Sequence, residues 1–132
     1  MTDISNIESS TLPRLQPSLP AELYSDPAVY QEELTKIWYQ QWIYAGRVDG
    51  LSRPGDYRLT TIGNQTIIIT LNREGQVRAF YNTCRHRGAE LCQAQQGHFK
   101  QDRITCPYHR WSYSLEGALL NTPNLEISND HH

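Results

Sequence analysis

The spacing of apolar residues changes near Trp42, from a helical pattern to an alternating one. Before that point, Ser25-Asp26-Pro27 predicts a helix start, because a capping side chain precedes proline at the first helical position. The helix is expected to run to about Gln40 and to pack one apolar face against the domain, a face that comprises Tyr30, Leu34, Ile37, Trp38 and Trp42. Residues 1–20, rich in Pro, Ser and Thr, are predicted to form an extended arm.

After Trp42 the alternation predicts short strands, the first of them over Trp42–Val48. Asp56–Ile62 and Gln65–Leu71 flank Gly63-Asn64, the two-residue signal of a tight hairpin, and three isoleucines in succession from Ile67 predict a strand buried on both faces. Further expected elements are a turn at 53–56, a turn at 72–76, a strand Val77–Tyr81, a segment His98–Thr105, and a hairpin of Trp111–Leu115 with Gly117. The pattern therefore predicts a mainly β fold: a small antiparallel domain over residues 41–125, preceded by an arm and one helix over 1–40 and followed by a tail over 126–132.

The length and composition of the chain limit the number of domains, the cellular location and the classes of partner. A length of 132 residues allows one domain with a modest core. The chain has no apolar run long enough for a membrane span and no basic-then-apolar leader, so we expect a cytoplasmic protein without a membrane partner. A net charge of −2 is too close to neutral to suggest nucleic acid as a partner.

Two short motifs in the alternating region each combine one cysteine with one histidine. Cys84-Arg85-His86 has the spacing C-x-H, and Cys106-Pro107-Tyr108-His109 has the spacing C-x-x-H. Nineteen residues separate the two motifs, enough for the chain to leave and return as a hairpin, so that two loops face each other across a metal. Cys92, the third cysteine, is expected to be a small core residue.

Two kinds of metal site fit these ligands. One tetrahedral zinc ion accepts two thiolates and two imidazoles, although zinc motifs usually keep like ligands together in one loop. A Rieske-type [2Fe–2S] cluster needs two thiolates on one iron and two imidazoles on the other, so each loop must supply one ligand of each kind. The arrangement of Cys84, His86, Cys106 and His109 is of this second kind.

The two motifs resemble those of a known family, the Rieske non-haem iron oxygenases, in the large (α) subunit. The resemblance extends from about Leu19 to the end of the chain, and it is carried by Cys84-Arg85-His86-Arg87-Gly88-Ala89, Cys106-Pro107-Tyr108-His109, Trp111-Ser112-Tyr113 and Glu116-Gly117. Respiratory Rieske proteins have a disulfide-forming cysteine in each loop and a serine that bonds a cluster sulfide. Here Ala89, Tyr108 and Trp111 take those places, so we expect no disulfide and a low-potential cluster.

The resemblance implies roles for these residues. It implies that Cys84, His86, Cys106 and His109 bind the cluster, with Arg87, Tyr108, Trp111 and Tyr113 around them. Tyr113 is then a candidate hydrogen-bond donor to a ligand sulfur, with a core aromatic as the alternative interpretation, whereas Trp111 and Tyr108 would shield the cluster from water. The family usually has glycine after the second histidine, where this chain has Arg110, so the loop either avoids a positive φ or is strained there.

The resemblance also implies partners: a reductase or ferredoxin that donates electrons, and an oxygenase catalytic domain or a neighbouring subunit that receives them. Family members often form trimers, so a homo-oligomer is a further expectation. Residues 84–110 contain five basic and two acidic side chains, whereas residues 1–40 contain two basic and six acidic ones. The simpler interpretation is a solvated surface whose cations offset an anionic cluster; the other is attraction of an acidic electron donor.

The second domain of the oxygenases, which holds a mononuclear iron, has no counterpart that would fit after Leu125. Asp130-His131-His132 carries the right residue types for that iron, but adjacent residues on a tail cannot hold its geometry, and His98 is expected to have a surface or hairpin role. We therefore expect the chain to transfer single electrons as the N-terminal part of an oxygenase and to oxygenate nothing alone. Alternatives are a stand-alone ferredoxin-like Rieske carrier and a zinc-stabilised interaction module. Leu19-Pro20 and Tyr24–Pro27 resemble the subgroup that acts on quaternary ammonium compounds.

Overall fold

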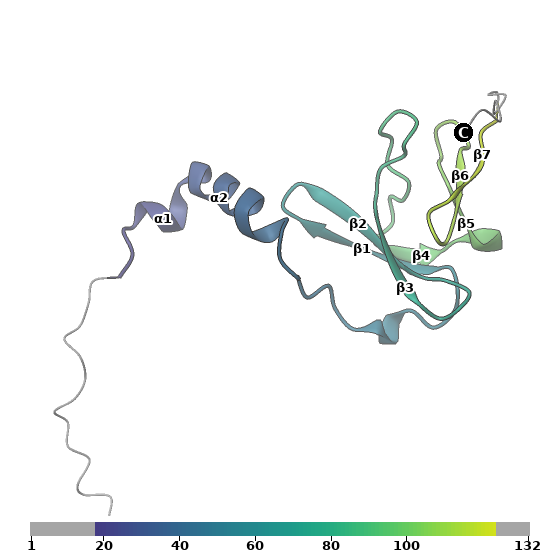
Figure 1. Ribbon diagram of the computed structural model, residues 1–132, viewed down its shortest axis with the longest axis horizontal. Helices are drawn as coiled ribbons and strands as arrows, with labels where there is room; N and C mark the ends of the chain where they lie inside the picture. The colour runs from purple at the N-terminus through teal and green to yellow at the C-terminus, as the bar shows by residue number, and fades with distance from the viewer. Residues whose placement is uncertain (1–17, 124–132) are drawn as a thin grey trace, which may run out of the picture.

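Two antiparallel sheets form the body of the protein. The structure, a computed structural model, describes residues 18–123. One sheet has the strand order β3-β2-β1-β4 and the other has the order β5-β6-β7, as Figure 1 shows. The strands are β1 (Asp56–Ile62), β2 (Gln65–Leu71), β3 (Val77–Tyr81), β4 (Gln96–His98), β5 (Arg103–Thr105), β6 (Ser112–Ser114) and β7 (Leu119–Asn121). The predicted mainly β, antiparallel fold is confirmed.

The hairpins begin and end close to where the local signals place them. β1 and β2 pair around Gly63-Asn64, with Ile62 opposite Gln65 and Gly63 at φ 59°. β2 lies between β1 and β3, and Ile68 and Ile69 on it are buried, whereas Ile67 is only half-buried. A central strand with β-branched residues thus supplies the middle of the larger sheet.

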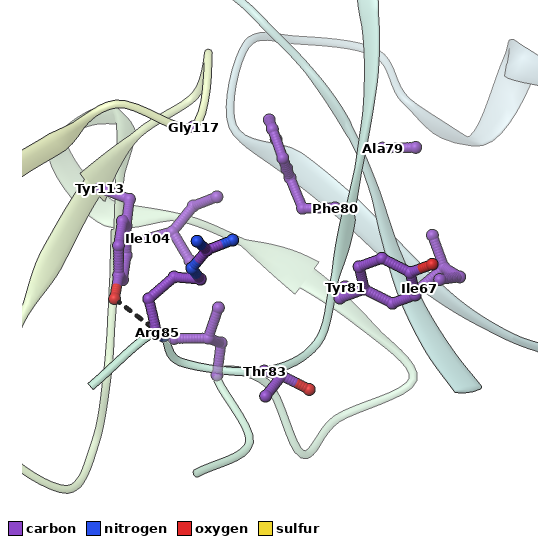
Figure 2. A pocket seen from close by; sticks show the side chains of 10 residues that line it. Ile67, Ala79, Phe80, Tyr81, Thr83, Arg85, Ile104, Tyr113 and Gly117 are labelled. Atoms are coloured by element: carbon purple, nitrogen blue, oxygen red, sulfur yellow. Dashed lines mark hydrogen bonds between the residues drawn. The ribbon is translucent and has the colours of Figure 1, made fainter. Parts of the chain in front are cut away.

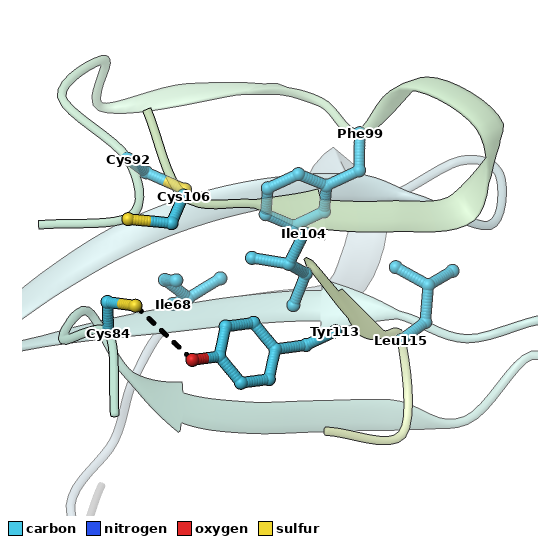
Figure 3. Close-up of a cluster of buried hydrophobic side chains, with 8 residues drawn as sticks. All are labelled: Ile68, Cys84, Cys92, Phe99, Ile104, Cys106, Tyr113 and Leu115. Atoms are coloured by element: carbon cyan, nitrogen blue, oxygen red, sulfur yellow. Dashed lines mark hydrogen bonds between the residues drawn. The ribbon is translucent and has the colours of Figure 1, made fainter. Parts of the chain in front are cut away.

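The core lies between the two sheets and includes the ligand cysteines expected from the sequence. Figure 3 shows the eight buried side chains of this cluster: Ile68, Cys84, Cys92, Phe99, Ile104, Cys106, Tyr113 and Leu115. Its members come from both sheets and from the loops that connect them. The two loops that carry the Cys-His motifs are therefore attached directly to the best-packed part of the molecule.

The N-terminal helical region differs from the expectation. It consists of α1 (Glu22–Ser25), α2 (Pro27–Glu33) and a π-helical turn, η1 (Leu34–Trp38), and Asp26 caps α2 by accepting a hydrogen bond from the N–H of Ala28 at 2.8 Å. The predicted packing of the whole apolar face is wrong, because only Leu34 is buried. The helical segment lies near the β1–β2 turn, where the hydroxyl of Tyr39, directly after η1, donates to Asn64 Oδ1 at 2.8 Å.

The predicted strand Trp42–Val48 is also absent from the described structure. Gly46 has a φ of 106°, which interrupts extended backbone, and the segment ends in a 3₁₀ turn, η2 (Val48–Gly50). Trp42 and Tyr44 point into solvent rather than into a core. β1 pairs with β2 on one side and, over 56–58, with β4 on the other, and the segment 42–48 pairs with neither sheet.

Two sequence-based predictions fall outside residues 18–123: most of the arm over 1–20, and the tail with Asp130-His131-His132. The boundaries proposed for the arm, the domain and the tail stay predictions. Among the residues that the structure describes, no helix is both long enough and apolar enough to cross a membrane.

Candidate metal centre

The two motif loops close with the same pair of backbone hydrogen bonds. In the first loop the N–H of Cys84 donates to the carbonyl of Ala89 at 2.8 Å, and the N–H of Gly88 donates to the carbonyl of Cys84 at 2.9 Å. The second loop repeats this scheme, with Cys106 N–H to the Trp111 carbonyl at 2.8 Å and Arg110 N–H to the Cys106 carbonyl at 3.1 Å. Each cysteine is thereby fixed at the base of a closed turn.

Gly88 and Arg110 occupy equivalent positions, four residues after the cysteine of their loop. Both have a positive φ, 72° at Gly88 and 64° at Arg110. The expectation that Arg110 either avoids this conformation or is strained is thus resolved in favour of strain. The closing hydrogen bond of the turn requires the left-handed backbone, which glycine adopts freely and arginine adopts at a cost.

The two thiols lie together in the core. Cys84 and Cys106 are each only 2% exposed, and the Cys84 sulfur lies 3.2 Å from the hydroxyl oxygen of Tyr113. Burial alone raises the pKa of Cys84, but hydrogen bonds from Tyr113, from the N–H of His86 and from Cys106 outweigh it and lower that pKa. The surroundings of Cys84 therefore favour a thiolate, the form that binds metal.

Tyr113 connects the thiol pair to the first loop. Its hydroxyl also accepts a hydrogen bond from the backbone N–H of Arg85 at 3.2 Å, and Figure 2 shows this contact beside the cavity between β3 and β6. Burial, reinforced by Cys84, raises the pKa of Tyr113 to about 12. The hydroxyl thus keeps its proton at neutral pH and is available as a donor to sulfur.

The two imidazoles form a second pair, further out than the thiols. The ring centres of His86 and His109 are 4.7 Å apart with the rings nearly perpendicular, and both side chains are partly exposed. Trp111 stacks on His86 with ring centres 4.6 Å apart and an angle of 6° between the planes. Tyr108 lies against His109 at 3.8 Å but is itself 63% exposed, so it covers one ring face only.

One nitrogen of the imidazole pair indicates a missing bond. His86 Nδ1 is buried and has no hydrogen-bond partner within the described residues, which is uncommon for a buried polar atom. Burial, together with the nearby positive charges of His109 and Arg87, lowers the pKa of His86 and so favours its neutral form. A neutral imidazole with an unpaired inward nitrogen fits a metal ligand.

The side chains are grouped by ligand type. Thiol lies with thiol, and imidazole lies with imidazole. A [2Fe–2S] cluster of the Rieske kind takes two protein ligands on each iron, so the donor set fits that group.

His98, Cys92 and Arg87 lie outside the two ligand pairs. His98 lies on β4, with its Nδ1 2.9 Å from Oδ1 of Asp56 on β1. Cys92 is 5% exposed, and burial raises the pKa of its thiol to about 11, in keeping with the expected core role. Arg87 is exposed beside His86.

Asn82 is the residue of this region that the sequence interpretation missed. It is buried, its Nδ2 donates to the Cys92 carbonyl at 2.7 Å, and its Oδ1 accepts from the N–H groups of Leu91 and Cys92. It therefore ties the strand end before the first loop to the chain that leaves that loop. The one available signal was a polar residue directly after an apolar strand, which is too common to be specific.

Comparisons with known proteins agree with this geometry. The family model described as the Rieske [2Fe-2S] domain matches residues 41–129. The oxygenase subunit of glycine betaine monooxygenase from Chromohalobacter salexigens is 39% identical over 78% of this chain and 23% of its own length. The alpha subunit of biphenyl 2,3-dioxygenase from Rhodococcus jostii is 32% identical over 92% of this chain and 25% of its own length.

Solved structures give the same result. The apo form of the quaternary ammonium Rieske monooxygenase CntA superposes with a TM-score of 0.78 at 32% identity, over 87% of this chain and 33% of that one. Naphthalene 1,2-dioxygenase from Rhodococcus sp. gives 0.73 at 32% identity, over 80% and 23%. The chain spans about a quarter of the length of the curated relatives it matches. With its paired thiols, paired imidazoles and two matching loops, this chain belongs to the Rieske [2Fe–2S] domain family, and its cofactor is the Rieske-type cluster.

Proposed function

We propose that Cys84, His86, Cys106 and His109 bind the cluster and that the chain carries single electrons through it. The observation that supports this most directly is the separation of the donors into a buried thiol pair and a half-exposed imidazole pair with an unpartnered Nδ1 on His86. When bound, the cluster supplies one-electron oxidation and reduction, typically at roughly −150 to +300 mV.

The surrounding residues hold these ligands in place. The two closed turns fix the cysteine positions, and Tyr113 directs its hydroxyl to the Cys84 sulfur. Trp111 holds the His86 ring by stacking and shields one face of it from water. Since hydrogen bonds to ligand sulfur and access of water both tune the potential of such sites, Tyr113 and Trp111 are the residues assigned to that tuning.

At the level of the whole protein, we propose that the chain is the electron-transfer part of an oxygenase α subunit in the cytoplasm. A reductase or ferredoxin would be the donor, and a mononuclear iron in a catalytic domain would be the acceptor. The similarity to oxygenase subunits supports this proposal. A quaternary ammonium substrate stays a prediction, because relatives named for glycine betaine and for 2-halobenzoate are 39% and 36% identical.

The test is an EPR spectrum of the dithionite-reduced protein, purified without air, with iron, sulfide and zinc measured on the same sample. Two irons per chain and an average g lower than that of all-cysteine clusters would be the expected result, because histidine ligates one of the two irons. Cys84→Ser and Cys106→Ser should each abolish the signal, whereas Cys92→Ala, the matched control, should keep it. Stoichiometric zinc without an EPR signal would refute electron transfer and would indicate that the metal site is structural.

A further inference from the structure

A cavity of about 460 Å³ lies between β3 and β6, beside the metal centre (Figure 2). Much of its wall is apolar and comes from Phe80 on β3, Ile104 on β5, Leu91 and the ring of Tyr113. Cavities of roughly 300–1,000 Å³ with mainly apolar walls are typical of sites for small molecules. The cavity therefore has the size and the lining of a ligand site.

A single charged side chain, that of Arg85, lines this cavity. Among the described residues around it, none is acidic and none besides Arg85 is basic. The hydroxyl of Tyr113 accepts the backbone N–H of Arg85 at 3.2 Å, and Figure 2 shows the guanidinium group turned into the cavity. Within residues 18–123 this guanidinium group has no hydrogen-bonded or ionic partner.

Several other arginines of the protein are paired with a carboxylate. Arg47, Arg53 and Arg73 each form an ion pair with an aspartate side chain. Arg85 has no such pair, and it adjoins apolar side chains instead. A lone cation among apolar walls is complemented by a ligand that has one negative charge and an apolar body.

A carboxylate is the anion that suits this guanidinium group, because the planar fork of arginine binds it through two parallel hydrogen bonds. Apolar walls that exclude water strengthen such an ion pair. We propose that the cavity binds a small apolar monocarboxylate, with its carboxylate on Arg85 and its apolar part against Phe80, Ile104 and the ring of Tyr113.

Tyr113 connects the cavity to the metal centre. Its hydroxyl lies 3.2 Å from the Cys84 sulfur and also holds the backbone of Arg85. The Arg85 charge favours the more negative, reduced state of the site, and a bound carboxylate neutralises that charge. Binding should therefore lower the midpoint potential, and by linkage the reduced protein should bind the carboxylate less tightly. This coupling rests on the proposed function, whereas the binding itself does not.

The test titrates the cluster-loaded 132-residue chain with 2-naphthoate by isothermal titration calorimetry. The uncharged 2-naphthamide, which has the same ring system, is the matched ligand. Wild type should bind naphthoate with one site per chain and should bind the amide roughly tenfold more weakly, because the amide lacks the charge that pairs with Arg85.

Variants separate this ion pair from general charge. Arg85→Gln should weaken naphthoate binding roughly tenfold and leave naphthamide binding unchanged, whereas Arg85→Lys should retain part of the affinity. Arg103→Gln, the matched control, removes an exposed guanidinium group directly before Ile104 on β5. Successive side chains of a strand point to opposite faces, so Arg103 faces away from the cavity and its loss should change the affinity less than about twofold.

Two further measurements locate the ligand and its effect. Thr83→Trp narrows the cavity from an exposed lining position and should weaken the binding of both ligands. A redox titration with saturating 2-naphthoate should give a lower midpoint potential than one without it in wild type, and no shift in Arg85→Gln. Far-UV circular dichroism checks that each variant is folded.

Several results would overturn the proposed site: naphthoate and naphthamide bound equally by wild type, wild-type affinity in folded Arg85→Gln, or an equal loss in Arg103→Gln, which would mean that net charge alone attracts the ligand. Self-association that is lost in Arg85→Gln, with no naphthoate binding by wild type, would assign Arg85 to a carboxylate of a second copy. Binding as expected in a protein without a histidine-ligated cluster would instead refute the proposed function and leave the site standing.

Discussion

At the scale of single residues, Gly88 and Arg110 adopt the same left-handed backbone conformation, which strains arginine and does not strain glycine. Each donates its N–H to the carbonyl of the cysteine four residues earlier, and each does so with a positive φ. Among residues 18–123, and apart from its two chain neighbours, no atom lies within 4 Å of the place where a Cβ on Gly88 would be, so backbone strain is what opposes a side chain there. The two positions therefore form a matched pair for measuring that strain.

Arg110→Gly is expected to raise the free energy of unfolding by about 0.5–1 kcal/mol, the relief of left-handed strain less the added entropy of the unfolded chain. Gly88→Ala should lower it by about 1 kcal/mol for the inverse reason. Urea unfolding of both variants measures these differences. Two changes of the same sign would contradict the assignment of equivalent left-handed turns.

Tyr113→Phe removes a hydroxyl from the Cys84 sulfur and keeps the ring. Because the hydrogen bond stabilises the more negative, reduced site, its loss should lower the midpoint potential by about 40 mV, the equivalent of about 1 kcal/mol in a one-electron couple. Protein-film voltammetry or a redox titration would show this. Tyr57→Phe, a hydroxyl deletion at a tyrosine stacked on Phe99 rather than bonded to Cys84, is the control and should leave the potential unchanged. Equal potentials in Tyr113→Phe and wild type would remove Tyr113 from the tuning role.

At the scale of elements, the sequence predicted well wherever the signal was local. The β1–β2 hairpin follows from Gly63-Asn64 between two alternating segments, and the start of α2 follows from the Asp26-Pro27 cap. The Trp42–Val48 strand was wrong because alternation alone does not say whether a segment pairs with a sheet. The equivalence of Gly88 and Arg110 could not be predicted either, since it depends on hydrogen bonds that close each loop.

Asp56 joins several elements at the start of β1. Its carboxylate accepts from the N–H groups of Ser52 and Arg53 at 3.0 and 3.1 Å and lies 2.9 Å from Nδ1 of His98 on β4. Burial works to raise the pKa of Asp56, but the hydrogen bonds from His98, Ser52 and Arg53 together lower it. In the unfolded chain this carboxyl should titrate near its ordinary value, about 3.9.

A lowered pKa in the folded state means that the unfolded state binds more protons at acidic pH. The stabilisation by Asp56 is therefore fully present above a pH of about 4 and is lost as pH falls through the folded-state pKa. Asp56→Asn should lower stability at neutral pH and should flatten the decline of stability between pH 5 and 3, values that bracket the titration by about one unit. Urea unfolding across that range measures it, with Asp49→Asn, an exposed surface carboxylate, as the control. If the free energy of unfolding of Asp56→Asn fell with pH as steeply as that of wild type, this role would be contradicted.

At the scale of the whole molecule, the N-terminal helices and the β domain meet through few side chains. Within the described residues of α1, α2 and η1, only Leu34 is buried. It contacts the β1–β2 turn so closely that a Cβ on Gly63 would lie 2.5 Å from the Leu34 Cδ2. Sequence periodicity identified the apolar face but not that most of it faces solvent, because periodicity does not report what lies opposite.

Leu34→Ala is accordingly expected to lower the free energy of unfolding by about 2 kcal/mol, at the low end for a buried leucine because one side of the site can relax. Trp42→Ser, at a fully exposed tryptophan, should change it by less than about 0.5 kcal/mol. Thermal or urea unfolding, followed by far-UV circular dichroism, distinguishes the two. If Trp42→Ser proved the more damaging variant, the exposed position of Trp42 would be wrong.

The two ligand pairs lie at different depths, and this limits from which side the site can be approached. The thiols are 2% exposed and enclosed by core, whereas the imidazoles reach the surface, so the site is insulated on one side and open on the other. With the four ligands as proposed, the two histidines are the part of the site that a partner surface can approach, while the two cysteines stay enclosed by the core.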